Sequence, residues 1–314
     1  MKFKLLIIAG FAFCISYAYA QTSKNDTTGT QTMPKDSVQF FHDTISGGEE
    51  DFDSGMLDLN LFNNNSFDRR RSTIEASYGF VNPEFHKDVY KGEFSKTNSL
   101  DLKLGFTRYI KTQTDYTQKY SLSALSLSRH SQDFGKLDTS KTNIELWNFG
   151  LFSREGYAYK LGEDASIALT NGGFTGWSIM NYTGSPDSLD KKALDVFGDN
   201  LRFSKTTEAA VIVRVHKWVA VTGSFERQII FPRFMFWYWC GSEIIEEIAD
   251  TGLEKLIKPI FKNAPSIAPV VNFILKNGLK IGMDQLRHKY MNWPIKTAAP
   301  LTNDAVKIGL TFTF

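Results

Sequence analysis

Apolar and polar side chains alternate with a period of two along most of this chain, from Ser72 to its last residue. A period of two is typical of a β-strand with one apolar and one polar face, whereas an amphipathic helix repeats about every 3.6 residues. The end of the chain shows the alternation most clearly. One face carries Val306, Ile308, Leu310, Phe312 and Phe314, and the other carries Lys307, Gly309, Thr311 and Thr313. The pattern predicts a protein made mainly of β-sheet.

Eight segments carry this alternation, which indicates eight strands. The segments are 74–80, 100–107, 119–130, 143–153, 157–169, 208–215, 219–228 and 306–314. In 119–130 and 143–153 the apolar face shifts by one residue, as a β-bulge would cause. An alternative interpretation adds 175–183 as part of a further pair, which gives ten strands.

The connections between these segments are alternately short and long. The short ones are 111–117, 154–156 and 216–217, and the long ones are 82–98, 131–142, 171–201 and 231–303. Bacterial outer-membrane barrels have this arrangement, with short periplasmic turns and long extracellular loops. In hydrocarbon every backbone N–H and C=O needs a partner within the protein, so membrane-spanning strands must close on themselves. We therefore predict an eight-stranded antiparallel up-and-down transmembrane β-barrel with both termini in the periplasm.

The last strand, residues 307–314, resembles the C-terminal signature of Gram-negative outer-membrane β-barrels, because it alternates and ends in phenylalanine. In those families the barrel-assembly machinery reads the aromatic end. The resemblance implies that Phe312 and Phe314 form an assembly signal and that this machinery is a transient partner. The region Ala18-Tyr19-Ala20 before Gln21 also resembles exported proteins of the Bacteroidota. Together these features imply the cell outer membrane, in contact with its lipid and lipopolysaccharide.

Residues 1–20 have the pattern of a secretory signal peptide, with Lys2 and Lys4 before an apolar run and small residues at the cleavage site. Residues 21–71 are polar, and we expect a largely disordered periplasmic segment. Without the two signal lysines, the 36 Lys and Arg fall to 34, which equals the 34 Asp and Glu. A nucleic-acid partner is therefore not expected, since binders of nucleic acid carry a basic excess.

The polar face of each predicted strand carries charges of both signs. The set is Glu75, Asp101, Lys103, Lys160, Asp164, Glu208, Arg214, Glu226 and Lys307. Eight strands enclose an interior just wide enough to be filled by side chains, and buried charges need partners. We expect a salt-bridged lumen charge network that fills the barrel. A proton or ion path along the same groups is the alternative.

The connection 231–303 is far longer than a loop needs to be, and its apolar residues recur at helical spacing. Ile244 and Ile248 fit one stripe, and Thr251 with Glu254 forms a capping box. We expect residues 72–314 to form the barrel, with 231–303 an extracellular helical cap before the last strand. The cap could pack over the barrel mouth, against a partner protein, or into the outer leaflet.

An aromatic run begins this connection, and Trp and Tyr favour membrane interfaces. We expect it to contact the membrane interface or a protein partner through Phe234, Phe236, Trp237, Tyr238 and Trp239.

Catalytic residues are sparse. Some eight-stranded barrels are enzymes that hydrolyse or transfer acyl chains of lipid A, and they need a His beside a Ser near the outer rim. His130 and Ser131 are the candidates here, but adjacent residues of an extended strand point to opposite faces. We found no motif for a metal or a cofactor and expect neither.

The favoured hypothesis is a non-enzymatic accessory subunit of an outer-membrane assembly for transport, secretion or barrel insertion. The alternative is a lipid A-modifying enzyme that uses His130 and a nearby Ser.

Overall fold

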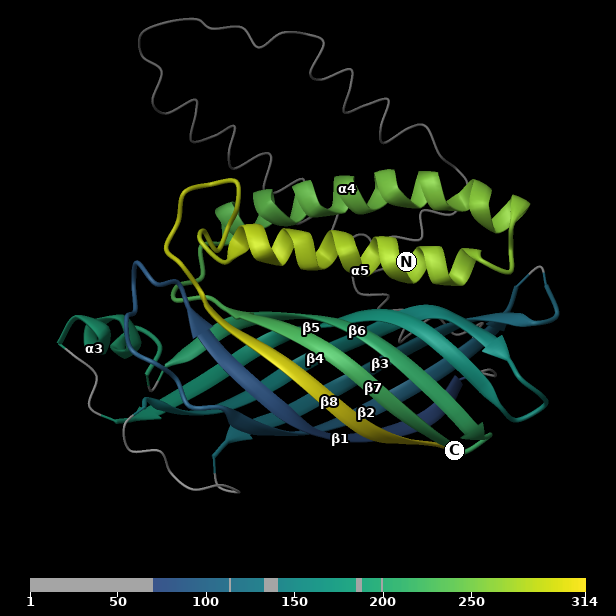
Figure 1. Cartoon of the computed structure of the whole chain (residues 1–314), viewed down its shortest axis with the longest axis horizontal. Helices are drawn as coiled ribbons and strands as arrows, with labels where there is room; N and C mark the ends of the chain where they lie inside the picture. The colour runs from purple at the N-terminus through teal and green to yellow at the C-terminus, as the bar shows by residue number, and fades with distance from the viewer. Residues whose placement is uncertain (1–69, 113, 133–140, 185–187, 199) are drawn as a thin grey trace, which may run out of the picture. The chain divides into compact units, whose positions relative to one another are not determined.

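Eight antiparallel strands follow one another around a closed barrel, and β8 completes the ring by pairing with β1 (Figure 1). The strands are β1 (Arg70–Phe85), β2 (Thr97–Lys111), β3 (Thr117–Ser131), β4 (Asn143–Lys160), β5 (Ser166–Thr183), β6 (Leu201–His216), β7 (Val219–Ile230) and β8 (Leu301–Thr313). Each strand pairs with its neighbour in the sequence. The prediction of an eight-stranded up-and-down barrel is confirmed.

The computed structural model describes residues 70–112, 114–132, 141–184, 188–198 and 200–314. All of them belong to one compact unit, residues 60–314. The predicted signal peptide (1–20) and nearly all of the predicted polar segment (21–71) lie outside the described residues. Arg70 and Arg71, at the end of that segment, already belong to β1.

The two ends of the barrel differ. The long-loop end carries the connections 86–96, 132–142, 184–200 and 231–300, and the short-turn end carries 112–116, 161–165 and 217–218. Helix α3 (Ser188–Asp195) lies in the β5–β6 connection. Helices α4 (Phe236–Asn263) and α5 (Ala268–Arg287) lie in the β7–β8 connection. None of the described helices is both long and apolar enough to cross a membrane.

The turn expected at Arg154–Gly156 is wrong, because β4 continues through it to Lys160. The turn between β4 and β5 is at residues 161–165 instead. Gly156 suggested a turn, but it lies within the sheet, where an added Cβ would collide with the Leu169 carbonyl oxygen of β5. Thr175–Thr183, the extra strand of the ten-strand alternative, is the second half of β5.

The β-bulges expected in 119–130 and 143–153 are also absent, since β3 and β4 pair in continuous register there. Apolar residues occur on both faces of these segments for another reason. Leu122 of β3 and Leu146 of β4 point into apolar layers of the lumen, whereas Leu125 and Trp147 point outward. A strand segment with apolar residues on both faces therefore lies where the lumen is apolar as well as the outer surface.

Most of the barrel exposes its apolar face and buries its polar one. In β1 and β8 burial alternates residue by residue, with Phe80 66% and Val306 63% exposed while Glu75 and Lys307 are buried. The exposed large apolar residues of the strands form an outward belt: Ile74, Tyr78, Phe80, Leu100, Leu102, Leu104, Phe106, Leu125, Leu127, Trp147, Phe149, Trp177, Ile179, Leu201, Val211, Val213, Val215, Val306, Ile308, Leu310 and Phe312.

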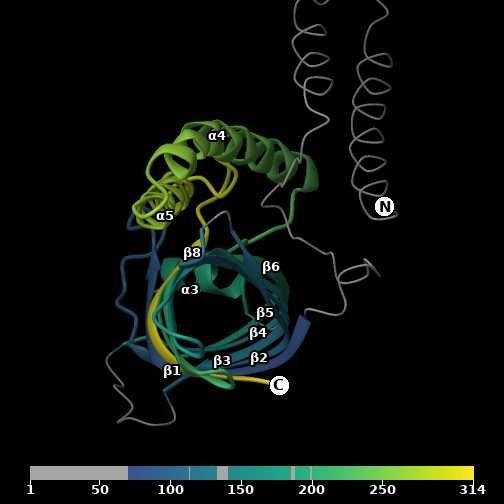
Figure 2. The same ribbon diagram turned by 90° about the vertical axis from the view of Figure 1, so that its right-hand side faces the viewer.

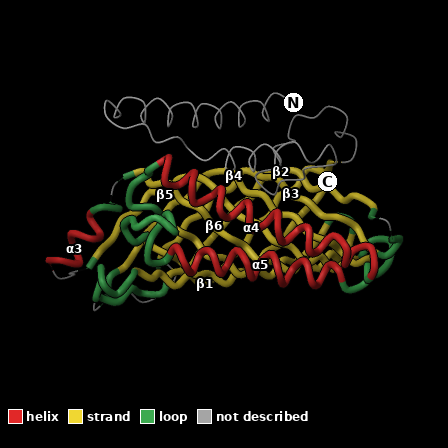
Figure 3. Tube along the Cα trace, turned by 90° about the horizontal axis from the view of Figure 1, so that it is seen from above, coloured by secondary structure: helices red, strands yellow, loops and turns green. Residues whose placement is uncertain are grey.

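Helices α4 and α5 form an antiparallel pair that lies along the outside of the barrel wall (Figures 1 and 3). Seen along the barrel, the pair lies beside the ring of strands and does not cover its opening (Figure 2). Helix α5 contacts β4, β5, β6 and β7. Of the three positions considered for these helices, the one over the barrel mouth is therefore wrong, because the helices pack on the wall at β4–β7, which offers them polar partners.

Candidate functional site

The middle of the lumen is occupied by a buried charge cluster that joins strands on opposite sides of the barrel. We define the lumen charge cluster as Glu75, Asp101, Lys103, Arg154, Glu208, Glu226 and Lys307, all buried. Arg154 lies between two carboxylates. Its Nη1 donates to Glu75 Oε2 at 2.7 Å, and its Nε and Nη2 donate to Glu208 Oε1 and Oε2 at 2.5 and 2.8 Å. Such paired, two-point contacts are the strongest type of charge-assisted hydrogen bond.

Two lysines extend the cluster. Lys103 Nζ lies 3.2 Å from Glu75 Oε1 and 3.1 Å from Glu208 Oε2, and it sits 3.9 Å from the ring centre of Phe152. Lys307 Nζ contacts Asp101 and lies 2.6 Å from Glu226 Oε2. Each buried charge in the cluster therefore has an opposite charge within contact distance, which is the condition for keeping it inside a narrow lumen.

The predicted lumen residues fall into two groups. Glu75, Asp101, Lys103, Glu208, Glu226 and Lys307 lie together in the cluster. Lys160, Asp164 and Arg214 lie elsewhere, toward the short-turn end. Lys160 ends β4, Asp164 is in the β4–β5 turn near His216, and Arg214 lies over the ring of Tyr109 at 4.5 Å. Lys160 and Arg214 lie too near the ends of their strands, and Asp164 lies in a turn, so none of the three meets the central charges.

Arg154 is the functional residue that the sequence reasoning missed, because residues 154–156 were assigned to a turn. The sequence did contain a signal. If the alternation of 147–153 is continued, even-numbered positions face inward and odd-numbered positions face outward through residue 160. That parity places Arg154 in the lumen and Tyr157 on the wall.

A layer of amide and hydroxyl groups lies next to the charge cluster. Asn148 Nδ2 donates to Ser128 Oγ at 2.9 Å, and Asn148 Oδ1 accepts from Ser178 Oγ at 2.6 Å and from Gln228 Nε2 at 2.8 Å. Asn303 Nδ2 donates to Gln228 Oε1 at 2.9 Å. These bonds join β3, β4, β5, β7 and β8 across the lumen. The layer thus ties the wall together as well as filling it.

The residual cavity between these two layers has a volume of about 20 Å³. Asp101, His130 and Lys307 are among the residues that line it. A cavity of this size has room for a single water molecule. The lumen therefore holds no open aqueous path through this region.

His130 and Ser131, the candidate catalytic pair, end strand β3 and are both buried. His130 faces the small lumen cavity, and the next residue of an extended strand leaves the opposite face. The pair therefore does not form a His–Ser contact inside the lumen. Among the described residues, no group of three or more His, Cys, Asp or Glu side chains is placed to hold a metal ion.

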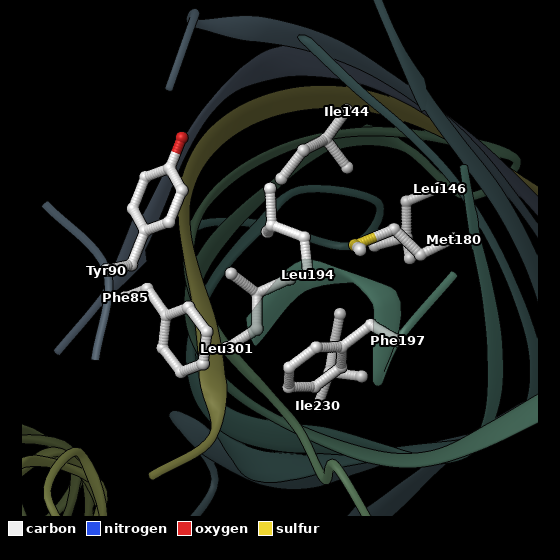
Figure 4. Close-up of a cluster of buried hydrophobic side chains, with 9 residues drawn as sticks. All are labelled: Phe85, Tyr90, Ile144, Leu146, Met180, Leu194, Phe197, Ile230 and Leu301. Atoms are coloured by element: carbon white, nitrogen blue, oxygen red, sulfur yellow. The ribbon is translucent and has the colours of Figure 1, made fainter. Parts of the chain in front are cut away.

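An apolar cluster closes the long-loop end (Figure 4). It consists of Phe85, Tyr90, Ile144, Leu146, Met180, Leu194, Phe197, Ile230 and Leu301. Leu194 and Phe197 come from α3 and the turn after it, so the β5–β6 connection folds back into the mouth. Asp190 of α3 fixes this position by accepting from the backbone N–H groups of Lys91 and Gly92 at 3.0 and 2.9 Å. Burial raises the pKa of the loop residue Tyr90, whose hydroxyl donates to Thr142 Oγ1 at 2.7 Å.

The predicted aromatic contact residues lie where the chain leaves β7. Phe234, Phe236, Trp237 and Tyr238 are 43–46% exposed, and Trp239 is half-buried. The rings of Phe234 and Trp239 lie 4.8 and 5.5 Å from that of Phe203 on the barrel wall. The aromatic patch, which we define as Phe234, Phe236, Trp237 and Tyr238, is thus anchored to the wall and exposed outward.

Comparison with known proteins gives no matching family model and no matching curated protein. Among solved structures, the chain is similar to the crystal structure of Neisserial surface protein A (NspA), with a TM-score of 0.37, 9% identity, and coverage of 77% of this chain and 97% of that one. It is also similar to Ail, the attachment invasion locus protein of Yersinia pestis, with a TM-score of 0.31, 8% identity, and coverage of 78% and 99%. These values describe a distant likeness in fold.

Proposed function

We propose that the protein is an integral outer-membrane β-barrel that serves as a non-catalytic structural or accessory subunit of an outer-membrane protein assembly. The observation that carries the proposal is the inverted distribution of side chains: apolar residues face outward and paired charges face inward. A soluble barrel needs the opposite distribution, because exposed apolar surface is unfavourable in water. A lipid environment makes both faces favourable.

The dimensions agree with a bilayer. The described strands have 12 to 18 residues, and a tilted strand needs roughly 9–11 to cross the hydrocarbon layer. The outward belt takes large apolar residues from β1, β2, β3, β4, β5, β6 and β8. The side chains at Ile74, Leu102 and Ile308 would face lipid tails.

The filled lumen supports a non-catalytic role. His130 faces a cavity of about 20 Å³, which is far too small for an acyl chain. The alternative, an enzyme that modifies lipid A, would have to place its substrate elsewhere. We therefore propose that the protein functions through its outer surface and not through its lumen.

The aromatic patch is the surface proposed to dock a protein partner. Aromatic residues are enriched at protein interfaces, and this patch lies beside the long-loop end, where other subunits can reach it. The identity of the partner proteins would show whether the assembly serves transport, secretion or barrel insertion.

Two experiments test the proposal. In membrane fractionation and on unheated detergent gels, the full-length protein should be found in the outer membrane and should migrate faster than the boiled form. A soluble protein without this mobility shift would contradict the membrane assignment.

For the docking surface, affinity purification from native membranes should compare a Trp237→Ser/Tyr238→Ser variant with Leu256→Ser, which changes an exposed apolar site farther along α4 and outside the aromatic patch. The aromatic variant should lose co-purifying proteins that the control retains. The same set of proteins with both variants would overturn the docking role.

A further inference from the structure

We infer that α4 and α5 form a hairpin embedded in the membrane beside the barrel, with their charged faces packed against a polar strip of the wall and their apolar faces in contact with lipid acyl chains. The inference rests on the proposed outer-membrane barrel and adds to it. It concerns the connection 231–303, which the sequence predicts as an extracellular cap with the outer leaflet as one of three possible positions.

The hairpin spans the height of the barrel. Helix α4 has 28 residues, and at 1.5 Å per residue it is about 42 Å long, more than the roughly 30 Å of a hydrocarbon layer. At the short-turn end, Tyr159 Oη of β4 donates to the Ser266 carbonyl oxygen at 2.7 Å, in the link between the helices. At the long-loop end, Trp239 of α4 contacts Phe203 of β6. The helices therefore run beside the same strand segments that cross the bilayer (Figure 3).

The two helices bury most of their polar residues against the wall or each other, and outside the last turns of α4 their exposed residues carry no charge. The buried residues are Ser242, Glu246, Asp250 and Ile257 of α4, and Ala268, Pro269, Asn272, Lys276, Asn277, Met283, Asp284 and Arg287 of α5. The exposed residues of α5 are Val270, Ile274, Leu275, Gly278, Gly282, Gln285 and Leu286, with no charge among them. A helix on the surface of a water-soluble protein has the reverse distribution.

The buried charges pair with one another and with the wall. Lys205 of β6 faces outward, and its Nζ lies 2.8 Å from Glu243 Oε2 and 2.9 Å from Glu246 Oε2 of α4. Arg287 of α5 lies 3.0 and 2.6 Å from oxygens of the same two glutamates. This group of four charged side chains, which we term the wall ion cluster, joins both helices to one strand.

A second set of ion pairs lies nearer the short-turn end. Lys276 Nζ of α5 lies 2.5 Å from Glu254 Oε1 and 3.5 Å from Asp250 Oδ2 of α4, and 3.6 Å from Glu155 Oε1 of β4. Glu155, like Lys205, is an outward-facing charge within a strand and several residues from either end of it. Without the hairpin, both would face hydrocarbon, which is unfavourable for a charged side chain on the lipid face of a barrel.

The wall under the hairpin differs from the rest of the barrel surface. Its outward positions include Glu155, Asn171, Lys205, Thr207 and Ala209, whereas the outward belt elsewhere consists of large apolar residues. The hairpin covers this polar strip and presents Ile245, Ile248 and Ile274 in its place. The apolar surface of the barrel is thereby continued over the helices.

The exposed charges of α4 are confined to its last turns. They are Lys255, Lys258 and Lys262, close to the short-turn end. Long lysine side chains near the end of a membrane segment can reach the polar headgroups. The lipid-contacting part of the hairpin is therefore the stretch between the aromatic patch and these lysines, together with the exposed face of α5.

The test uses the full-length protein with Cys240→Ser, reconstituted in phosphatidylcholine/phosphatidylglycerol vesicles. Single cysteines at Ile248 and Ile274 report on the hairpin, Ile308→Cys reports on the barrel belt, and Lys262→Cys reports on the helix end. Each carries an environment-sensitive fluorophore, and quenching is measured with brominated acyl chains and with aqueous iodide. Labels at 248 and 274 should lose fluorescence to the brominated lipid as the label at 308 does, whereas the label at 262 should respond to iodide.

The outcomes separate the two proposals. Iodide quenching at 248 and 274 with lipid quenching at 308 would overturn the embedded hairpin and leave the barrel assignment intact. Absence of both kinds of quenching at 248 and 274 would also overturn it, because a second protein surface would then cover the helices. Iodide quenching at 308 as well would overturn the membrane barrel itself.

Discussion

Arg154 of β4 and Glu208 of β6 form a two-point ion pair inside the lumen, between strands that are separated by β5. Both side chains are fully buried. The pair therefore braces the barrel internally, in addition to the hydrogen bonds of its wall. Its removal is the most direct test of the lumen charge cluster.

Replacement of Arg154 by Met should strongly destabilise the barrel, because Glu75 and Glu208 would remain buried without their main partner. Breaking a buried pair by removing one member costs about 3–5 kcal/mol. The free energy of unfolding from urea titration of the refolded barrel measures the loss. The matched control is Arg129→Ala, which removes a partly exposed pair with Glu145 and should cost about 1 kcal/mol or less. Equal losses in the two variants would contradict the bracing role.

Replacement of Lys205 by Leu should loosen the helical hairpin while the barrel stays closed. Glu243 and Glu246 would keep only Arg287 as a partner, and a buried carboxylate without adequate compensation is costly. Hydrogen exchange should become faster in 236–287 but not in the strands. Lys262→Ala, at an exposed site, is the control and should leave exchange unchanged. Faster exchange throughout the barrel would show that the wall ion cluster is not local to the hairpin.

Deletion of Phe314 should lower the amount of barrel inserted in cells without lowering the stability of the refolded protein. Its side chain is 68% exposed, so it contributes little to packing, whereas the terminal aromatic is the expected assembly signal. The heat-modifiable band in outer-membrane fractions measures insertion. Phe80→Ser, a similarly exposed belt position, is the control. Insertion that falls no further with the deletion than with this control would argue against a signal.

Replacement of His130 by Ala should leave the acylation of lipid A unchanged. The imidazole faces a water-sized cavity, so its loss removes no substrate contact within the lumen. Mass spectrometry of lipid A from cells with the wild-type chain, the variant and no chain measures the effect. A change in acyl number shared by the variant and the cells without the chain would establish the enzyme alternative.

The strand number and the direction of the apolar face follow from the sequence because hydrocarbon and a narrow lumen impose a strict period of two. The period of two is obscured where both faces of a strand are apolar. Leu122 and Leu146 point into the apolar ends of the lumen, so the pattern near them imitates a bulge. Gly156 was read as a turn because a glycine at a close approach within a sheet cannot be distinguished locally from a turn glycine.

The position of the hairpin could not be predicted from its own helical pattern, because the pattern shows which face is polar but not what that face contacts. The information lies in another part of the chain. Glu155 and Lys205 are charges at outward-facing strand positions, and each needs a partner outside the wall. If the inward-facing and outward-facing positions of β4 and β6 are assigned correctly from the sequence, these two charges locate the polar strip on the wall.

The filled interior has a consequence for how such a protein can participate in transport. Apolar layers at both ends, an amide layer and the lumen charge cluster leave no conduit through the described residues. In the proposed assembly, cargo would therefore have to pass outside this barrel or through a neighbouring subunit. A barrel with a filled interior can act on other molecules only through its outer surface. The side chains around that surface then determine which proteins can pack beside it.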